Sequence, residues 1–415
     1  MHIPEGNTSM APSEMVSDSS RRAKPSLKGN DLPSRARVLL IDPSEKGALP
    51  LYTSLIAAAL TSIGLRPVVL GSRRLLPSEI DSSWPVRRWL PAERWPRPPD
   101  EPSLSKWRQG LAWLSCSTVI VVSVLLMRPK IIHFQHSIHI RLDPLLLVIL
   151  RLFAPVVWTA HDTVPHDPST NTVDRAKRIY ALADLVLVHS SPAAEDVVRL
   201  SGVQPMIVNH PVRPVDVPPD RATARRQLGL KPHGRVAAAI GFIRAYKGYG
   251  LLADVWDRLG ESAPTLLVVG QLVDQSERDV IRRLQAHPRA DVRLGYASDR
   301  DVIAAFAAAD VILLPHERGS DSGSLHLARA VGTPVISSDS PQLSTVVANA
   351  SAGVVVPRDA ARWAEALTGE LPLSPPPPPP LFATGTEHLG AYDRARRFWC
   401  ARKDGIPEAD ARRIA

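Results

Sequence analysis

Short apolar runs alternate with helical stretches along most of this chain, and they fall into two series. The first series comprises 37–41, 67–70, 130–134, 156–160 and 185–188. The second comprises 236–240, 265–269, 291–294, 311–314, 334–337 and 353–356. Strands that alternate with helices are typical of βαβ units, whose strands pair in parallel. The pattern therefore predicts an α/β protein with parallel sheets.

The region between the two series, residues 210–232, contains Pro211, Pro214, Pro218 and Pro219. Each proline fixes its own φ angle and blocks the continuation of a helix. The chain has 415 residues, which is more than one hydrophobic core usually spans. We therefore expect two domains joined by a linker at 210–232.

The composition is globular and basic, with 50 Lys and Arg against 41 Asp and Glu and a formal net charge of +9. Such a surface favours nucleic acid, anionic lipid or phosphorylated substrates, but no recognition helix or stacking platform points to nucleic acid. The two cysteines, Cys116 and Cys400, cannot form a disulfide framework and lack metal-ligand spacing. A reducing cytosol fits this composition.

Two segments near the chain ends differ from the rest. Residues 1–35 are rich in Ser, Pro, Lys and Asn without an apolar core, which predicts a disordered tail and not a secretory signal. Residues 375–380 are an uninterrupted proline run, which adopts the extended polyproline II conformation. We interpret it as a stiff spacer before a C-terminal helical segment, 381–415; an adaptor ligand is the alternative.

The segment Gly241-Phe-Ile-Arg-Ala-Tyr-Lys-Gly248 directly follows the apolar run 236–240. A strand that ends in glycine and leads to two cations places positive charge at the carboxyl edge of a parallel sheet, where anionic ligands bind. Solvated cations at a helix start are the alternative, but the amino end of a helix is already positive and disfavours cations. We therefore predict that Arg244 and Lys247 bind an anion.

A second candidate segment is Asp321-Ser-Gly-Ser324, which precedes a helix predicted to run to about Ala330. Free backbone N–H groups at a helix start form a natural phosphate cradle, and Gly323 would permit close approach. An ordinary cap predicts the same residue types. The segment indicates a phosphate site only because of its position relative to Arg244 and to the Gly332-Thr-Pro334 turn.

Together, 241–248, 321–325 and 330–339 resemble the donor half of a nucleotide-sugar glycosyltransferase of the GT-B architecture, close to family 4 of the retaining enzymes. The resemblance covers roughly residues 36 to 400. It implies an α/β fold of two Rossmann-like domains whose parallel sheets face each other across a cleft. The first, 36–209, is expected to bind the acceptor, and the second, 233–374, the nucleotide sugar. The last helix is expected to cross back onto the first domain.

The resemblance also implies roles for single residues. Arg244 and Lys247 are expected to contact the donor diphosphate, where positive charge stabilises the leaving phosphate in the transition state. His161, at the end of 156–160, is expected near the transferred sugar. The donor site is further predicted to include Gly241, Glu317, Asp321, Ser322, Gly323 and Ser324, and the acceptor side Gly47 and His166. Retention of configuration is implied by the family and needs no protein nucleophile.

The chain departs from the family pattern at one point. Family 4 often carries two glutamates eight positions apart, the second five residues before the glycine of the Gly-Thr-Pro turn. Gly319 and Leu327 stand at those positions here. Glu317 lies two residues from the first position and is the candidate substitute. The ribose and sugar contacts of the pair are therefore unassigned.

Tryptophan and arginine concentrate in residues 84–113, which hold five of the nine tryptophans. They are Trp84, Trp89, Trp95, Trp107 and Trp113, with Arg87, Arg88, Arg94, Arg97 and Arg108. Indole rings favour lipid headgroups, and guanidinium groups attract anionic lipid. We expect this stretch to dock the protein on the inner face of the plasma membrane, where a lipid-linked acceptor is found; a proline-rich surface loop is the alternative.

Two apolar segments, 111–127 and 144–157, follow. A spanning helix needs about 20 apolar residues, whereas 111–127 has seventeen, four of them Ser or Thr. We do not expect it to cross a membrane. Core helices of an α/β domain are the alternative to a membrane-facing role.

Two patterns suggest a metal ion. His133, His136 and His139 recur at intervals of three, but no carboxylate or cysteine completes a zinc-like set. Asp299-Arg-Asp301 matches an acidic triplet that other glycosyltransferases use to hold a divalent cation. It directly precedes a helix predicted over 302–309, however, and Ser298 or Asp299 is expected to act as the cap of that helix. We predict neither a metal nor a cofactor.

The sequence thus predicts a metal-independent, cytoplasmic, peripheral membrane glycosyltransferase. It would pass a hexose from a nucleotide diphosphate sugar to a lipid-linked or polysaccharide acceptor. The alternatives are a nucleotide-sugar epimerase or hydrolase on the same fold and a non-catalytic glycan-assembly protein.

Overall fold

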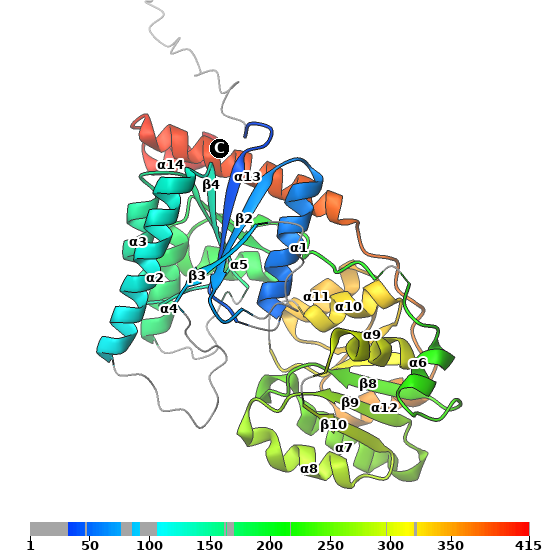
Figure 1. The fold of residues 1–415 in the computed structure, drawn as a ribbon. Helices are drawn as coiled ribbons and strands as arrows, with labels where there is room; N and C mark the ends of the chain where they lie inside the picture. The colour runs from blue at the N-terminus through cyan, green and yellow to red at the C-terminus, as the bar shows by residue number, and fades with distance from the viewer. Residues whose placement is uncertain are drawn as a thin grey trace, which may run out of the picture.

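The computed structural model describes residues 32–45, 48–75, 85–91, 106–161, 163, 170–215, 217–295, 297–318 and 322–414. The chain forms two α/β domains side by side (Figure 1). Each contains one parallel sheet between helices, so the predicted fold class is confirmed.

The first sheet has seven strands in the order β3-β2-β1-β4-β5-β6-β7, and every neighbouring pair is parallel. The strands are β1 (Arg37–Asp42), β2 (Arg66–Ser72), β3 (Val86–Leu90), β4 (Ile131–Phe134), β5 (Val156–Thr159), β6 (Leu185–Val188) and β7 (Met206–Ile207). The strand order reverses at β1, between β2 and β4. Open α/β sheets bind ligands at the carboxyl edge beside such a reversal.

Helices cover both faces of the first sheet, and β4, β5 and β6 are therefore buried along their whole length. One face packs against α1 (Ala48–Ser62) and α13 (Leu381–Lys403). The other packs against α2 (Lys106–Met127), α3 (Asp143–Leu150), α4 (Thr170–Leu182) and α5 (Ser191–Ser201).

The second sheet has six parallel strands in the order β10-β9-β8-β11-β12-β13. They are β8 (Val236–Ile240), β9 (Thr265–Gly270), β10 (Ala290–Leu294), β11 (Val311–Leu314), β12 (Val335–Ser338) and β13 (Gly353–Val356). Here the order reverses at β8. The loop that follows β8 contains Arg244 and Lys247.

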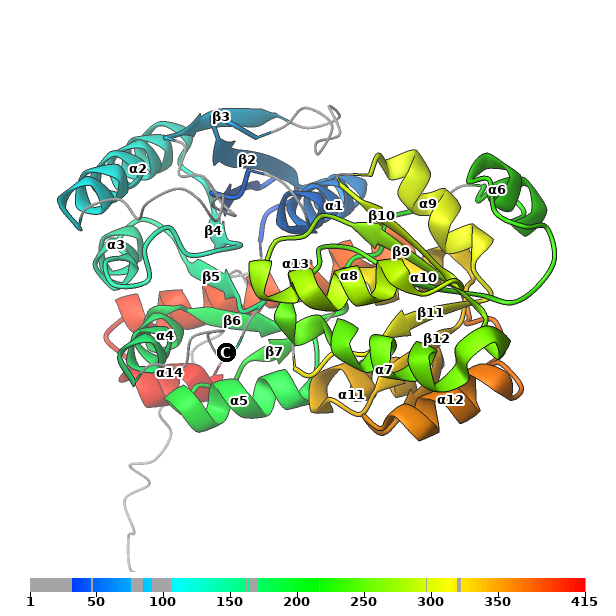
Figure 2. The same ribbon diagram turned by 90° about the horizontal axis from the view of Figure 1, so that it is seen from below.

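The helices of the second domain also form two layers (Figure 2). One layer contains α7 (Tyr249–Leu259), α8 (Arg278–Ala286) and α12 (Ala360–Thr368). The other contains α9 (Asp299–Ala308), α10 (Gly323–Val331) and α11 (Pro341–Asn349). Short 3₁₀ helices lie at η2 (Ala245–Lys247), η3 (Gly260–Ser262) and η4 (Gln275–Glu277).

The segment predicted as the interdomain linker, 210–232, contains a helix, α6 (Arg221–Gln227). Ala224 of α6 is buried against Ala307 and Ala308 of α9, and Arg225 pairs with Asp310 at 2.7 Å. The last third of the segment therefore packs as part of the second domain.

The chain ends return to the first domain. Helix α13 begins directly after the prolines at 375–380 and packs on α1. The two helices are so close at Gly385 that a Cβ on this residue would lie 2.3 Å from the carbonyl oxygen of Ala59. The last helix, α14 (Glu408–Ile414), follows.

Leu32, in the segment predicted as a disordered tail, is buried and its N–H donates to Asp393 of α13. Residues 1–31 lie outside the described residues.

Candidate functional site

The loop after β8 brings the two predicted cations together. Gly241 directly follows β8 with φ +128°, and a Cβ on it would lie 3.1 Å from Lys247 Nζ and 3.5 Å from Ser324 Oγ. The backbone conformation therefore favours glycine there, and Lys247 and Ser324 both lie beside it. Arg244 precedes η2 as its N-cap residue and is half-buried. It lies close enough for its charge to affect Lys247.

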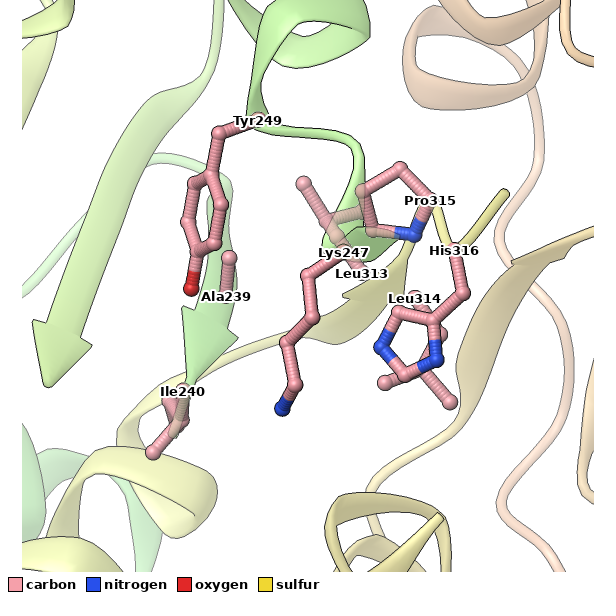
Figure 3. A pocket seen from close by; sticks show the side chains of 8 residues that line it. All are labelled: Ala239, Ile240, Lys247, Tyr249, Leu313, Leu314, Pro315 and His316. Atoms are coloured by element: carbon pink, nitrogen blue, oxygen red, sulfur yellow. The ribbon is translucent and has the colours of Figure 1, made fainter. Parts of the chain in front are cut away.

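The Lys247 side chain extends between Tyr249 and His316 into a pocket (Figure 3). The rest of its lining comes from the ends of β8 and β11: Ala239, Ile240, Leu313, Leu314 and Pro315. Burial, and then the positive charge of Arg244, lowers the pKa of Lys247 to about 8. An anion bound there would raise the pKa of Lys247 again and so favour the charged ammonium form.

His316 supplies an imidazole to the same pocket. Burial, followed by the charges of Lys247 and Arg358, holds the pKa of His316 well below its ordinary value. The imidazole is therefore neutral at physiological pH. It can exchange hydrogen bonds with a ligand without adding charge.

The start of α10 lies next to the β8 loop. Ser324 Oγ donates a hydrogen bond of 2.9 Å to the carbonyl of Ile240, which fixes the helix start against the end of β8. Ser322 is the N-cap residue, and its side chain makes no capping hydrogen bond. Apart from its chain neighbours and its own helix, no described residue places a heavy atom within 4 Å of the position that a Cβ on Gly323 would take. Among the described residues there is thus room for close approach at Gly323, which a phosphate cradle needs.

Glu317, the candidate substitute for a family glutamate, is held by a cation. Its carboxylate pairs with Arg358 at 2.9 Å, and its N–H donates to the Tyr246 carbonyl in η2 at 2.8 Å. The residue therefore lies beside the β8 loop, but Arg358 balances its charge. Leu327, at the second glutamate position, packs against the apolar core of the second domain.

His161 follows β5 at the carboxyl edge of the first sheet. Its ring meets the Tyr52 ring edge to face, with centroids 4.5 Å apart. Burial is the main reason that its pKa lies well below the ordinary value, and the charges of neighbouring histidines act in the same direction. Nε2 of His161 has no hydrogen-bond partner among the described residues. A neutral imidazole with one nitrogen available can contact a sugar hydroxyl.

The remaining predicted site residues either lie outside the described residues or are found elsewhere in the structure. Gly47, Arg94, His166 and Asp321 lie outside the described residues. Arg87, Arg88 and Trp89 form most of β3, the edge strand of the first sheet, where all three are exposed. The structure thus brings Gly241, Lys247 and Ser324 together and places the β3 residues elsewhere.

Several polar residues at strand ends were missed from the sequence. Asp42 ends β1 and accepts hydrogen bonds from Thr53 Oγ1 at 2.6 Å and the Ser44 N–H at 2.9 Å. Gln135 follows β4, is fully buried, and its amide N and O have no partner among the described residues. Both residues lie at the end of an apolar run, and this position in the sequence could have marked them as candidates for the carboxyl edge of the sheet.

The residues of the two patterns that suggested a metal make structural contacts instead. His133 exchanges hydrogen bonds with Tyr392 Oη at 2.9 Å and Thr159 Oγ1 at 2.7 Å. Ser298 caps α9 by accepting from the Asp301 N–H, as predicted. Asp299 pairs with Arg213 at 2.7 Å. Among the residues that the structure describes, no group of three or more potential ligands could hold a metal ion.

The match to a family model lies within the second domain. Residues 234–371 match the family described as glycosyl transferases group 1. The D-inositol 3-phosphate glycosyltransferase of Corynebacterium efficiens is 30% identical over 159 residues, which are 36% of this chain and 38% of that protein. The chain thus spans well under two thirds of this relative's length.

Solved structures align over nearly the whole chain. Anabaena HepE in complex with UDP-glucose has a TM-score of 0.61 and 16% identity, covering 91% of this chain and 97% of that one. WaaG, a glycosyltransferase involved in lipopolysaccharide biosynthesis, has a TM-score of 0.56 and 16% identity, covering 91% and 99%. The predicted GT-B architecture is confirmed: the chain has the fold of GT-B nucleotide-sugar glycosyltransferases, and its second domain matches the glycosyl transferases group 1 family.

Proposed function

We propose that the protein transfers a hexosyl group from a nucleotide diphosphate sugar to a hydroxyl group of a lipid-linked or polysaccharide acceptor. The observation that carries this proposal is the meeting of Lys247, Arg244 and the start of α10 around Gly241. Two neighbouring cations beside a helix start suit a diphosphate.

The donor class follows from charge and from the comparisons. Cleavage of the sugar–phosphate bond leaves extra negative charge on the distal phosphate. Fixed positive groups stabilise that charge most in the transition state, and one such group contributes roughly 3 kcal/mol. Arg244 and Lys247 would supply this charge without a divalent cation. Because HepE was solved with UDP-glucose, a UDP-sugar is the first donor to test.

The acceptor would bind at the carboxyl edge of the first sheet. His161 offers a neutral imidazole there, and its buried Nε2, which has no partner among the described residues, would bond to the sugar or to the acceptor hydroxyl. WaaG acts in lipopolysaccharide biosynthesis, which supports a lipid-linked acceptor. We propose retention of configuration, in which the leaving phosphate accepts the proton of the attacking hydroxyl.

The test compares the wild type with Arg244→Ala. Binding of UDP-, GDP- and dTDP-sugars is first screened by saturation-transfer NMR, and turnover is then measured with the donor that binds. Arg244→Ala is expected to reduce turnover at least 100-fold, the loss typical of one such group. The control is Arg362→Ala, which removes an exposed cation of α12 that pairs with Glu365 at 3.1 Å.

Each alternative function has its own signature in this assay. Near-normal turnover of Arg244→Ala would refute the role of that guanidinium. Product formed without any acceptor would indicate a hydrolase or epimerase. Absence of nucleotide-sugar binding by calorimetry would favour a non-catalytic protein.

A further inference from the structure

Helices α2 and α3 lie on the outer side of the first domain, away from the second domain (Figures 1 and 2). On α2, six large apolar side chains are 45–72% exposed: Trp107, Leu111, Leu114, Val122, Leu125 and Leu126. On α3 and the turn after it, five are 37–62% exposed: Leu145, Val148, Ile149, Leu152 and Phe153. We call these eleven side chains the α2–α3 face. Contiguous apolar surface of this kind marks an interaction site.

The two sides of α2 differ in what they contact. Cys116, Ile120 and Val124 pack in the core of the first domain, whereas the exposed residues form a stripe at intervals of three and four. Thr118, within that stripe, donates its hydroxyl to the Leu114 carbonyl at 2.8 Å, so this polar group is satisfied inside the helix.

By length and composition alone, Trp107–Met127 could span a membrane, and 33% of its apolar window is buried. Its core-facing side, however, is held against the first sheet through the contacts of Ile120 and Val124. A spanning helix would have to give up those contacts. The arrangement fits a helix that lies in the plane of a membrane surface.

Cations predominate on the segments that carry the face, although Glu408 of α14 is exposed and pairs with Arg151 at the end of α3 at 3.7 Å. Within residues 85–91 and 106–161, six cations are exposed: Arg87, Arg88, Arg108, Arg128, Lys130 and Arg141. The one carboxylate in these ranges, Asp143, is buried and accepts hydrogen bonds from Trp113 Nε1 and Ser137 Oγ. Basic residues beside an apolar face complement anionic phospholipid headgroups.

We propose that the α2–α3 face binds the surface of an anionic phospholipid membrane, with α2 parallel to the membrane plane. A second copy of this chain is a poorer occupant, because two such faces would bring cations of like sign together. The proposal does not depend on glycosyl transfer. It gives the expected membrane association a defined surface, which shares Trp107 with the Trp- and Arg-rich segment singled out in the sequence.

The test is co-sedimentation of the full chain with vesicles of phosphatidylcholine alone or mixed with phosphatidylglycerol. The wild type is expected to bind the mixed vesicles more tightly. Leu114→Glu with Leu125→Glu should weaken that binding at least tenfold, whereas Leu373→Glu, at an 86% exposed site elsewhere, should not change it. Replacing Arg108 or Arg128 by alanine should cost about fivefold each.

A second readout needs no change to the leucines. Lipids with brominated acyl chains should quench the fluorescence of Trp107, which is 63% exposed, and the quenching should decrease in Trp107→Phe. Arg244→Ala should retain full vesicle binding, which separates this proposal from the proposed enzyme activity.

Three results would overturn the proposal. The first is a wild type that fails to bind mixed vesicles. The second is a leucine double variant that circular dichroism shows to be folded and that binds as tightly as the wild type. The third is a wild-type dimer, seen by light scattering, that the double variant abolishes, because it would assign the face to a second copy of the chain.

Discussion

The imidazole rings of His210 and His326 stack, with centroids 4.2 Å apart and planes 6° from parallel. His210 lies between the domains, where its ring also meets that of Tyr52 at 5.0 Å, and His326 is in the first turn of α10. Tyr52 in turn contacts His161. A continuous series of rings therefore connects the carboxyl edge of the first sheet to the first turn of α10 in the second domain.

We expect this stack to contribute measurably to stability. A pair of aromatic rings in contact contributes about 1 kcal/mol beyond area burial. In a double-mutant cycle of His210→Ala and His326→Ala, the free energies of urea unfolding should show a coupling of about that size. Strictly additive effects of the two substitutions would mean that the rings are merely adjacent.

The activity should depend on the charge of Lys247. Its pKa of about 8 means that the free enzyme loses a positive charge as the pH rises through that value. Above it, kcat/KM is expected to fall about tenfold per pH unit, because kcat/KM reports the free enzyme. A bound diphosphate raises the pKa, so kcat should fall less.

The measurement is a pH–rate profile from about 6 to 9.5. Lys247→Arg keeps its charge throughout this range, so any activity it retains should lack the alkaline decrease. A wild-type profile that is flat to the upper limit would show that the ammonium group is not required.

Acid should destabilise the first domain through its buried imidazoles. Burial lowers the pKa of His388 to about 4, whereas an unfolded histidine titrates near 6.5. The contribution of the neutral ring to stability is therefore complete above about pH 6.5 and is lost as the pH falls toward 4. A shift of this size corresponds to about 3 kcal/mol over that window.

Urea unfolding at several pH values between about 7.5 and 4.5 tests this expectation. His388→Gln should reduce the pH dependence of the unfolding free energy. The pKa values of His133 and His161 are lowered in the same direction, so some dependence should remain. An unchanged slope in His388→Gln would contradict the assignment.

Gly248 should tolerate no side chain. Its φ is +73°, and a Cβ would lie 2.1 Å from the carbonyl oxygen of Pro315. Gly248→Ala is expected to reduce the free energy of unfolding by about 3 kcal/mol or more. The matched control is Gly250→Ala in α7, where the Cβ would meet nothing within 4 Å.

At Gly250 alanine should stabilise the helix by up to about 1 kcal/mol. Thermal or urea unfolding of the two variants provides the comparison. Equal stability of the two would show that the β8 loop can move away from Pro315.

Local pattern was sufficient to predict most of the fold. Runs of β-branched and aliphatic residues such as 311–314 mark strands buried on both faces, and the structure has a strand there. The edge strand β3 was missed because Arg87, Arg88 and Trp89 are exposed, and its sequence therefore lacks an apolar run. β7 was missed because two residues are too short a signal.

The candidate site was predictable where one loop carries the chemistry. Gly241, Arg244 and Lys247 lie within eight residues of a strand end, so the sequence shows their proximity. The pairing of Glu317 with Arg358 spans 41 positions, and His210, in the segment between the domains, stacks on His326 of the second domain. Such contacts depend on how the helices and domains pack, which no local pattern encodes.

The chain passes between the domains twice, once before α6 and once through the prolines that precede α13. A hydrogen bond links the ends of these two crossings. The N–H of Asn209, at the first crossing, donates to Glu387 of α13, just after the second crossing, at 2.8 Å. Neighbouring crossings of this kind favour rotation of the two domains about them. The crossings would then act as a hinge, and the parts of the two sheets farthest from Asn209 would travel most whenever a substrate enters or leaves.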